Sequence, residues 1–130
     1  MTKINEFKKI IKNLNFDGVT RNLDELGRIV IPRVYRQDIY NEGTYVYVQT
    51  IEDCVIIADK NEFDTGIKKT LDELGRIMIP KEIRKSLNWN FRDLLMIWDV
   101  KNILIIKKLE GESIVCKKQE EPNKYICESW

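Results

Sequence analysis

One ten-residue segment occurs twice in this chain of 130 residues, with nine of its positions identical. It reads Leu-Asp-Glu-Leu-Gly-Arg-Ile-x-Ile-Pro at residues 23–32 and again at 71–80, where Met78 replaces Val30. The copies lie 48 residues apart, so the chain is a tandem duplication of one small unit. Two copies are too few for a solenoid, which needs several stacked units to bury its core. We therefore predict a closed pair in which each unit completes the other.

Composition favours one compact domain in the cytoplasm. Hydrophobic residues make up 43% of the chain, which suits a single domain with short extensions. No apolar run approaches the roughly 20 residues that span a bilayer, so no membrane contact is expected. The N-terminus lacks an apolar export signal, and an odd number of cysteines, three, argues against a secreted disulfide framework. We therefore expect a cytoplasmic protein.

The chain contains no histidine, which excludes several kinds of catalytic and metal site. Ser-His-Asp catalysis, Cys-His catalysis and histidine-ligated zinc all require it. The Asp-Glu pairs at 24–25 and 72–73 would point to opposite faces of an extended segment, so we interpret them as turn and cap residues. Cys116 and Cys127 supply half a zinc site at best. We expect no enzyme, no cofactor and no metal.

The first 16 residues are predicted to form an amphipathic helix ahead of the repeats. Apolar residues recur there at three- and four-residue spacing, at Ile4, Phe7, Ile10, Ile11 and Leu14. We favour a helix that covers an exposed flank of the core. A dimerising or partner-binding helix is the alternative that the sequence leaves open.

Each repeat has the same predicted order of elements: strand, turn, strand, helix and hairpin. In repeat one, residues 19–60, the predicted strands are 19–23, 28–31, 44–50 and 54–58. In repeat two, residues 67–108, they are 67–71, 76–79, 93–99 and 103–107. A proline at the first helical position begins each predicted helix, which runs from Pro32 to about Ile39 and from Pro80 to Leu87. Gly27 and Gly75 can supply a positive φ in the turns.

The apolar runs 28–31 and 76–79 show no polar alternation, which predicts that both faces of these strands are covered. A unit of this size cannot bury enough surface alone. Interleaving two units would provide the cover, so we predict a mostly β fold with short helices. Residues 111–130 are predicted to form a hairpin-like C-terminal extension that could add strands to the edge.

The second copy also carries a family resemblance. Residues 66–87 read Gly-Ile-Lys-Lys-Thr-Leu-Asp-Glu-Leu-Gly-Arg-Ile-Met-Ile-Pro-Lys-Glu-Ile-Arg-Lys-Ser-Leu, and this segment resembles the AbrB/SpoVT/MazE family of DNA-binding domains. The resemblance implies a swapped-hairpin β-barrel, which in that family usually forms from two chains. Here the tandem repeats would form it as an intrachain pseudo-dimer over residues 17–110. Members are mostly bacterial and archaeal transcription regulators or antitoxins.

The resemblance also implies a set of DNA contacts. In such domains basic residues on one barrel face contact double-stranded DNA from the strand before the turn, directly after the Leu-Gly, and from the helix after the proline. The matching residues are Arg21, Arg28 and Arg36 in the first copy and Lys69, Arg76, Lys81, Arg84 and Lys85 in the second. Arg33 also follows a proline, whereas Gln37 stands where a second helix base is expected. Clustered cations neutralise phosphates, and arginine can read guanine edges. Salt bridges to neighbouring acids are the alternative role.

The two repeats differ in charge. Residues 17–64 carry five Lys/Arg and ten Asp/Glu, whereas residues 65–110 carry ten and six. We therefore expect the second repeat to dominate DNA binding. In the first copy, Val34 and Tyr35 stand where the family has Glu-Leu, so the helix of that copy matches the family less well. In the second copy, residues 88–92 replace a glycine-containing turn after the helix.

Two functions follow from these observations. The first is a transcription regulator that binds double-stranded DNA. The second is a protein-binding module, either an antitoxin-like toxin neutraliser or a mobile-element-encoded inhibitor of a host protein. Such a module would use the N-terminal helix or the C-terminal tail. The sequence leaves open whether the chain also forms a homodimer.

Overall fold

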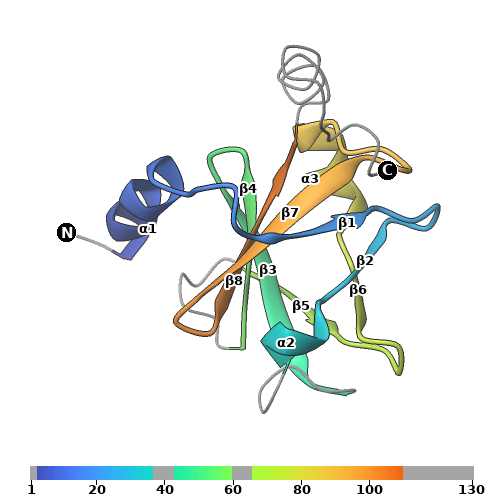
Figure 1. The fold of residues 1–130 in the computed structure, drawn as a ribbon. Helices are drawn as coiled ribbons and strands as arrows, with labels where there is room; N and C mark the ends of the chain where they lie inside the picture. The colour runs from blue at the N-terminus through green and yellow to red at the C-terminus, as the bar shows by residue number, and fades with distance from the viewer. Residues whose placement is uncertain (1–2, 37–42, 60–65, 110–130) are drawn as a thin grey trace.

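The structure is a computed structural model that describes residues 3–36, 43–59 and 66–109 (Figure 1). Within these residues the fold is mostly β, with a six-stranded antiparallel sheet, a two-stranded ribbon and three short helices. None of the described helices is long and apolar enough to cross a bilayer. The predicted mostly β fold with short helices is therefore confirmed.

The elements follow the predicted order in both repeats. An N-terminal helix α1 (Lys3–Lys12) precedes repeat one, which consists of β1 (Val19–Asn22), β2 (Arg28–Val30), α2 (Arg33–Arg36), β3 (Tyr45–Ile51) and β4 (Cys54–Ala58). Repeat two consists of β5 (Ile67–Thr70), β6 (Arg76–Met78), α3 (Lys81–Leu87), β7 (Leu94–Val100) and β8 (Ile103–Lys108). The predicted strand limits differ from the observed ones by about one residue.

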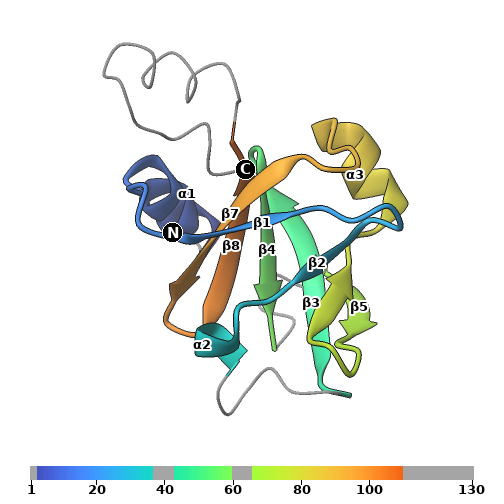
Figure 2. The same cartoon turned by 45° about the vertical axis from the view of Figure 1, so that its right-hand side comes forward.

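The two repeats exchange their first strands. The strand order of the large sheet is β1-β7-β8-β4-β3-β5. The first strand of repeat one therefore pairs with the hairpin of repeat two, and β5 pairs with the hairpin of repeat one. Figure 2 shows β1 crossing the molecule and turning back into β2. The small ribbon is also shared, because β2 pairs with β6. This order reads the same from either end when equivalent strands are matched, so the repeats are related by a pseudo-two-fold axis.

Apolar side chains form two cores, one on each face of the large sheet. The inner core lies between the sheet and the β2–β6 ribbon and contains Leu23, Ile29, Ile31, Val46, Val48, Val55, Ile57, Leu71, Ile77, Ile79, Trp89, Leu95, Ile97, Leu104 and Ile106. The outer core lies on the opposite face and contains Phe7, Ile11, Ile51, Cys54, Ile56, Met96, Trp98 and Ile105. Successive residues of β4 and β8 alternate between the two cores, as expected for a strand covered on both faces.

Helix α1 covers the outer core. Phe7 and Ile11 are buried there, and the indole Nε1 of Trp98 donates a hydrogen bond to the carbonyl of Asn15 at 2.8 Å. The apolar face of the helix therefore packs on the sheet of its own chain. The favoured interpretation, a helix that covers a flank of the core, is confirmed.

The prediction that β2 and β6 are covered on both faces was wrong. Ile29 and Ile77 are fully buried, but Met78 is 40% exposed and Val30 is half-buried. Successive side chains of a strand point to opposite faces, so Ile29 and Ile77 lie in the inner core while Val30 and Met78 lie on the outward face. The strands with both faces covered are the central ones of the large sheet.

The helix ends differ from the prediction in detail. Pro80 is the N-cap of α3, with φ −53° and ψ 142°, so the helix begins one residue later at Lys81. Asn88 ends it in the left-handed region, with φ 59° and ψ 45°, and asparagine tolerates this conformation better than most side chains. Asn88 therefore ends the helix without a glycine. The predicted end of the first helix near Ile39, and the extension at 111–130 with Cys116 and Cys127, lie outside the described residues.

The one-sided burial of the ribbon predicts a contrast between neighbouring residues. Ile77→Ala removes a fully buried side chain and should lower the free energy of unfolding by about 2–5 kcal/mol. Met78→Ala, on the outward face, should lower it by less than about 1 kcal/mol. Urea unfolding of both variants measures the difference. Equal losses would contradict the one-sided packing.

Candidate nucleic-acid interface

An aspartate organises the turn that precedes each strand of the ribbon. One carboxylate oxygen of Asp24 accepts hydrogen bonds from the backbone N–H groups of Leu26 (2.9 Å) and Arg28 (2.8 Å). The other accepts the guanidinium Nε–H of Arg28 at 2.8 Å. Both terminal Nη groups of this arginine lie outside these bonds. The aspartate therefore binds Arg28 through its Nε–H, and the two Nη groups of the guanidinium take no part in that bond.

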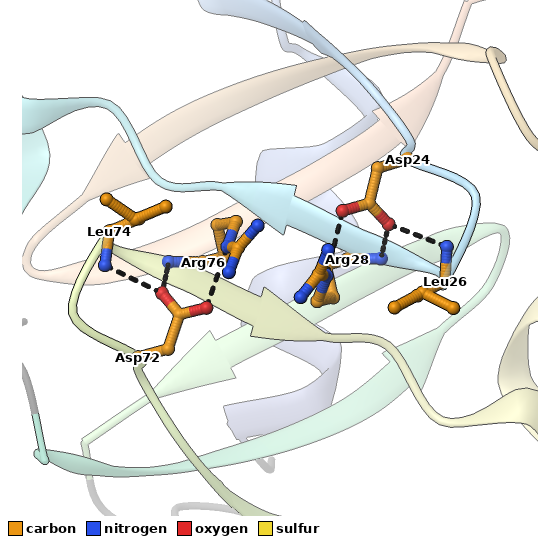
Figure 3. A network of polar contacts seen from close by, with 6 residues as sticks. All are labelled: Asp24, Leu26, Arg28, Asp72, Leu74 and Arg76. Carbon is orange, nitrogen blue, oxygen red and sulfur yellow. Dashed lines mark hydrogen bonds and ion pairs between the residues drawn. The ribbon is translucent and has the colours of Figure 1, made fainter.

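Repeat two contains the same turn. Asp72 accepts the backbone N–H groups of Leu74 and Arg76, each at 2.9 Å, and the Nε–H of Arg76 at 2.7 Å. Figure 3 shows Arg28 and Arg76 over the middle of the ribbon, with Leu26 and Leu74 at its opposite ends. The salt-bridge role considered for these arginines is therefore confirmed, and DNA contact stays a prediction.

These bonds hold both carboxyl groups in the ionised form. Partial desolvation raises the pKa of Asp24, but hydrogen bonds from the backbone and guanidinium of Arg28 and from the backbone of Leu26 outweigh that effect. The pKa of Asp24 is therefore below its usual value, and the pKa of Asp72 is lowered by the equivalent bonds. At neutral pH each carboxylate is therefore charged, and its hydrogen bond to the guanidinium restricts the position of the arginine.

Each helix arginine packs on the turn of the other repeat. Gly27 has φ +80°, and a Cβ atom there would collide with the guanidinium of Arg84. The Nε–H of Arg84 donates to the carbonyl of Ile79 at 2.9 Å, and the N–H of Ile79 donates to the carbonyl of Gly27 at 2.9 Å. The glycine is therefore required twice: for its backbone conformation and for the space that the arginine occupies.

The pseudo-two-fold axis repeats this contact. Gly75 has φ +77°, and the guanidinium of Arg36 lies where its Cβ would be. The Nε–H of Arg36 donates to the carbonyl of Ile31, whose N–H donates to the carbonyl of Gly75, both at 2.9 Å. Arg36 and Arg84 are half-buried. Each uses Nε in its carbonyl bond.

The four arginines follow one another along the ribbon in the order Arg84, Arg28, Arg76 and Arg36, which we call the arginine row. In the ribbon register Arg28 lies opposite Met78, and Arg76 lies opposite Val30. Arg84 is at the level of Gly27, at one end, and Arg36 is at the level of Gly75, at the other. Four of the eight predicted contact residues are thus brought together.

The other predicted residues flank the arginine row. Arg21 pairs with Leu95, and Lys69 with Val46. Both partners belong to the inner core, and directly paired residues lie on the same face of a sheet. Arg21 and Lys69 are therefore on the face of the sheet that is turned towards the ribbon, one on each edge strand. Arg21 donates its Nη1–H to the neighbouring carbonyl of Thr20. The exposed residues Lys81, Lys85 and Arg33 lie on the two short helices, and Gln37 is outside the described residues.

Sequence reasoning missed the contact between each helix arginine and the glycine of the opposite repeat. It treated the glycines only as turn residues and the arginines only as cations. The one signal in the sequence is that the turn is identical in both copies, with a glycine at the same position. In the structure the space beside that glycine is filled by an arginine of the other repeat. The partner itself could not be read from the sequence, because it comes from the other repeat.

A second feature lies on the opposite side of the sheet. A groove of about 660 Å³ runs between α1, the β3–β4 turn and the end of β8, and is lined in part by Ile11, Leu14, Phe16, Trp98 and Leu109. Lysines and acids at its border are paired with each other, as in the ion pair of Lys107 with Asp53 at 3.9 Å. The groove therefore combines an apolar part with polar and charged residues of both signs, among them Lys12, Asn15 and Glu52.

Metal and thiol chemistry find little support in the described residues. Across 3–36, 43–59 and 66–109, no three His, Cys, Asp or Glu side chains gather as a metal site. Cys54 is buried in the outer core, where burial and the nearby Asp53 raise the pKa of its thiol to about 12. This thiol stays protonated and unreactive at neutral pH.

Comparison with known proteins gives no assignment: no family model matches the chain, and no curated protein matches it significantly. The AbrB resemblance therefore stays a prediction from the quoted residues.

Acid should destabilise the fold through Asp24 and Asp72. Each carboxyl has a folded-state pKa below its ordinary value of 3.8, so the unfolded chain binds protons first as the pH falls. The stability that these groups contribute is complete above about pH 5 and is lost as the pH drops through 3.8 towards the folded pKa values. Urea unfolding at a series of pH values measures the loss.

The double variant Asp24→Asn/Asp72→Asn should be less stable at neutral pH and should lose less on acidification. Glu25→Gln/Glu73→Gln is the matched control, because it removes the adjacent exposed carboxylates and leaves the turn bonds intact. This control should keep the wild-type loss. Parallel curves for the wild type and the aspartate variant would show that the turns do not carry the effect.

Proposed function

We propose that this chain is a DNA-binding transcription regulator of the AbrB type, which contacts double-stranded DNA through the arginine row. The single observation that supports this most is the row itself. Four guanidinium groups, two from each repeat, follow one another along the two-stranded ribbon: Arg28 and Arg76 on its strands, and Arg84 and Arg36 on the turn glycines at its ends. Protein cores do not need such an arrangement, whereas phosphates and guanine edges attract it.

The dimensions of the row suit a DNA groove. The levels of Gly27 and Gly75 are four residues apart along the ribbon, which corresponds to about 13 Å at the usual strand rise. The major groove of B-DNA is about 12 Å wide and admits a two-stranded ribbon. In this arrangement the central Arg28 and Arg76 face base edges, and the outer Arg84 and Arg36 face the phosphates on either side.

Preorganisation adds to the proposal. The aspartates and carbonyls that accept the Nε–H groups restrict all four arginines before DNA arrives. Less side-chain entropy is then lost on binding. The Nη groups, which make the bidentate contact to a guanine edge, lie outside these bonds.

The finer fold is part of the same proposal. We propose that the large sheet and the ribbon together constitute the swapped-hairpin barrel of the family, an intrachain pseudo-dimer over residues 17–110. The exchange of β1 and β5 between the repeats supports it. So does the pairing of β2 with β6 across the pseudo-two-fold axis. The helix α3 supplies Lys81 and Lys85 beside the row, so its side would make more phosphate contacts.

A protein-binding module is the second candidate, and the groove beside α1 favours it. Its apolar residues, with charged residues of both signs beside them, suit a protein segment better than a nucleic acid. An antitoxin-like neutraliser or an inhibitor of a host protein would use this side. Such binding would depend little on salt and would survive loss of the arginine row.

A salt series on a labelled random-sequence duplex tests the first proposal. The affinity should fall steeply with salt, because DNA-bound counterions are displaced. Arg36→Ala/Arg84→Ala should weaken binding about tenfold or more and make the log–log salt slope shallower by about 2. Fluorescence anisotropy measures both quantities.

Lys9→Ala/Lys101→Ala is the matched control, because it removes the same charge from α1 and the β7–β8 turn, away from the row. Its salt slope should equal that of the wild type. An absence of salt-sensitive binding at low ionic strength would overturn the regulator proposal in favour of the protein-binding module. A control that loses as much affinity would show that net charge, and not the row, is responsible.

A further inference from the structure

We propose that each half of the DNA-binding face is a composite of both repeats, so that the two half-sites of its DNA are not read by repeat one and repeat two respectively. This inference rests on the proposed function. It assigns Arg28 and Arg84 to one half, and Arg76 and Arg36 to the other.

The first half combines the turn of repeat one with the helix of repeat two. Arg84 lies on Gly27, next to Arg28. The chain leading into this turn is held by repeat two as well: the N–H of Leu23 donates to the carbonyl of Asp93 at 3.0 Å, and the N–H of Arg92 donates back to Leu23 at 2.9 Å. The chain that leads into the turn of Arg28 is thus held by the segment between α3 and β7.

The second half has the opposite composition. Arg36 of repeat one lies on Gly75, next to Arg76 of repeat two. The chain leading into this turn is held by repeat one, because Leu71 exchanges backbone hydrogen bonds with Thr44 (3.3 Å) and Gly43 (3.0 Å). The register of the ribbon keeps the two halves apart, since the levels of Gly27 and Gly75 lie at its opposite ends.

The composite arrangement changes what the unequal charges of the repeats imply. The acidic repeat one contributes a central arginine and one helix arginine to the face, as does the basic repeat two. Each half therefore has two row guanidiniums and one turn aspartate. A duplex with two related half-sites fits this face, with the additional α3 lysines, Lys81 and Lys85, strengthening the half that contains Arg28.

Selection from a random duplex pool tests the assignment. The full-length wild type should enrich a motif with two related halves. Arg28→Ala/Arg84→Ala should erase the preference in one half, and Arg76→Ala/Arg36→Ala should erase it in the other. Arg76→Ala/Arg84→Ala, both from repeat two, should weaken both halves. Each double variant should bind the wild-type motif about tenfold or more weakly.

A second pair of variants leaves every arginine in the sequence. Gly27→Ala displaces the guanidinium of Arg84, and Gly75→Ala displaces that of Arg36, because each new Cβ occupies the space of a flexible side-chain end. Gly27→Ala should therefore weaken the same half of the motif as Arg28→Ala/Arg84→Ala. Circular dichroism and thermal unfolding identify any variant that fails to fold, and the glycine pair provides the readout if an arginine pair fails.

The outcomes separate the two proposals. If the wild type enriches no motif and binds no duplex, the DNA-binding function is wrong and the composite halves fall with it. If the wild type enriches a motif but Arg76→Ala/Arg84→Ala erases one half alone, each repeat reads its own half-site and the composite assignment is overturned. The assignment is also overturned if the arginine and glycine variants leave both halves unchanged.

Discussion

Two backbone hydrogen bonds at the ends of the β2–β6 ribbon fix how the two repeats are joined. The N–H of Ile31 donates to the carbonyl of Gly75, and the N–H of Ile79 donates to the carbonyl of Gly27, each at 2.9 Å. They tie the turn of one repeat to the strand end of the other. Each turn glycine is thereby held against the short helix of the other repeat. An arginine of that helix occupies the space that a side chain on the glycine would need. The large sheet depends on the same exchange, since β1 reaches β7 only because β2 has crossed to β6.

Burial explains why neither repeat would be stable by itself. The inner core takes residues from both repeats on every side, and a unit of about 45 residues exposes too much apolar surface alone. The outer face of the sheet presents Ile56, Met96 and Ile105, whose side chains need cover from another layer. Helix α1 supplies that cover through Phe7 and Ile11. Helix α1, which lies outside the duplicated segment, is thus part of the outer core.

Local patterns predicted the elements well and their partners poorly. The helix spacing of Phe7 and Ile11, the turn glycines and the capping prolines are written in short stretches, so nearly every element could be placed to within about one residue. Burial of β2 and β6 was misjudged because a short apolar run looks the same whether one face or two are covered, and only the elements that pack on each face decide. Half of the site residues meet in the arginine row for a similar reason. The sequence shows which residues are basic. It does not show that Arg84 contacts Gly27, because the two residues lie in different repeats and no periodic pattern connects them.

The exchanged strands belong to one polypeptide, and this has an evolutionary consequence. In a symmetric homodimer every substitution appears twice, so a change that improves one side of the face is imposed on the other. Here the copies can drift independently while the pairing that joins them stays intramolecular and independent of protein concentration. Met78 opposite Arg28, where the related position has Val30 opposite Arg76, is one such divergence on the outward face. A covalently joined pair can become a heterodimer without a second gene.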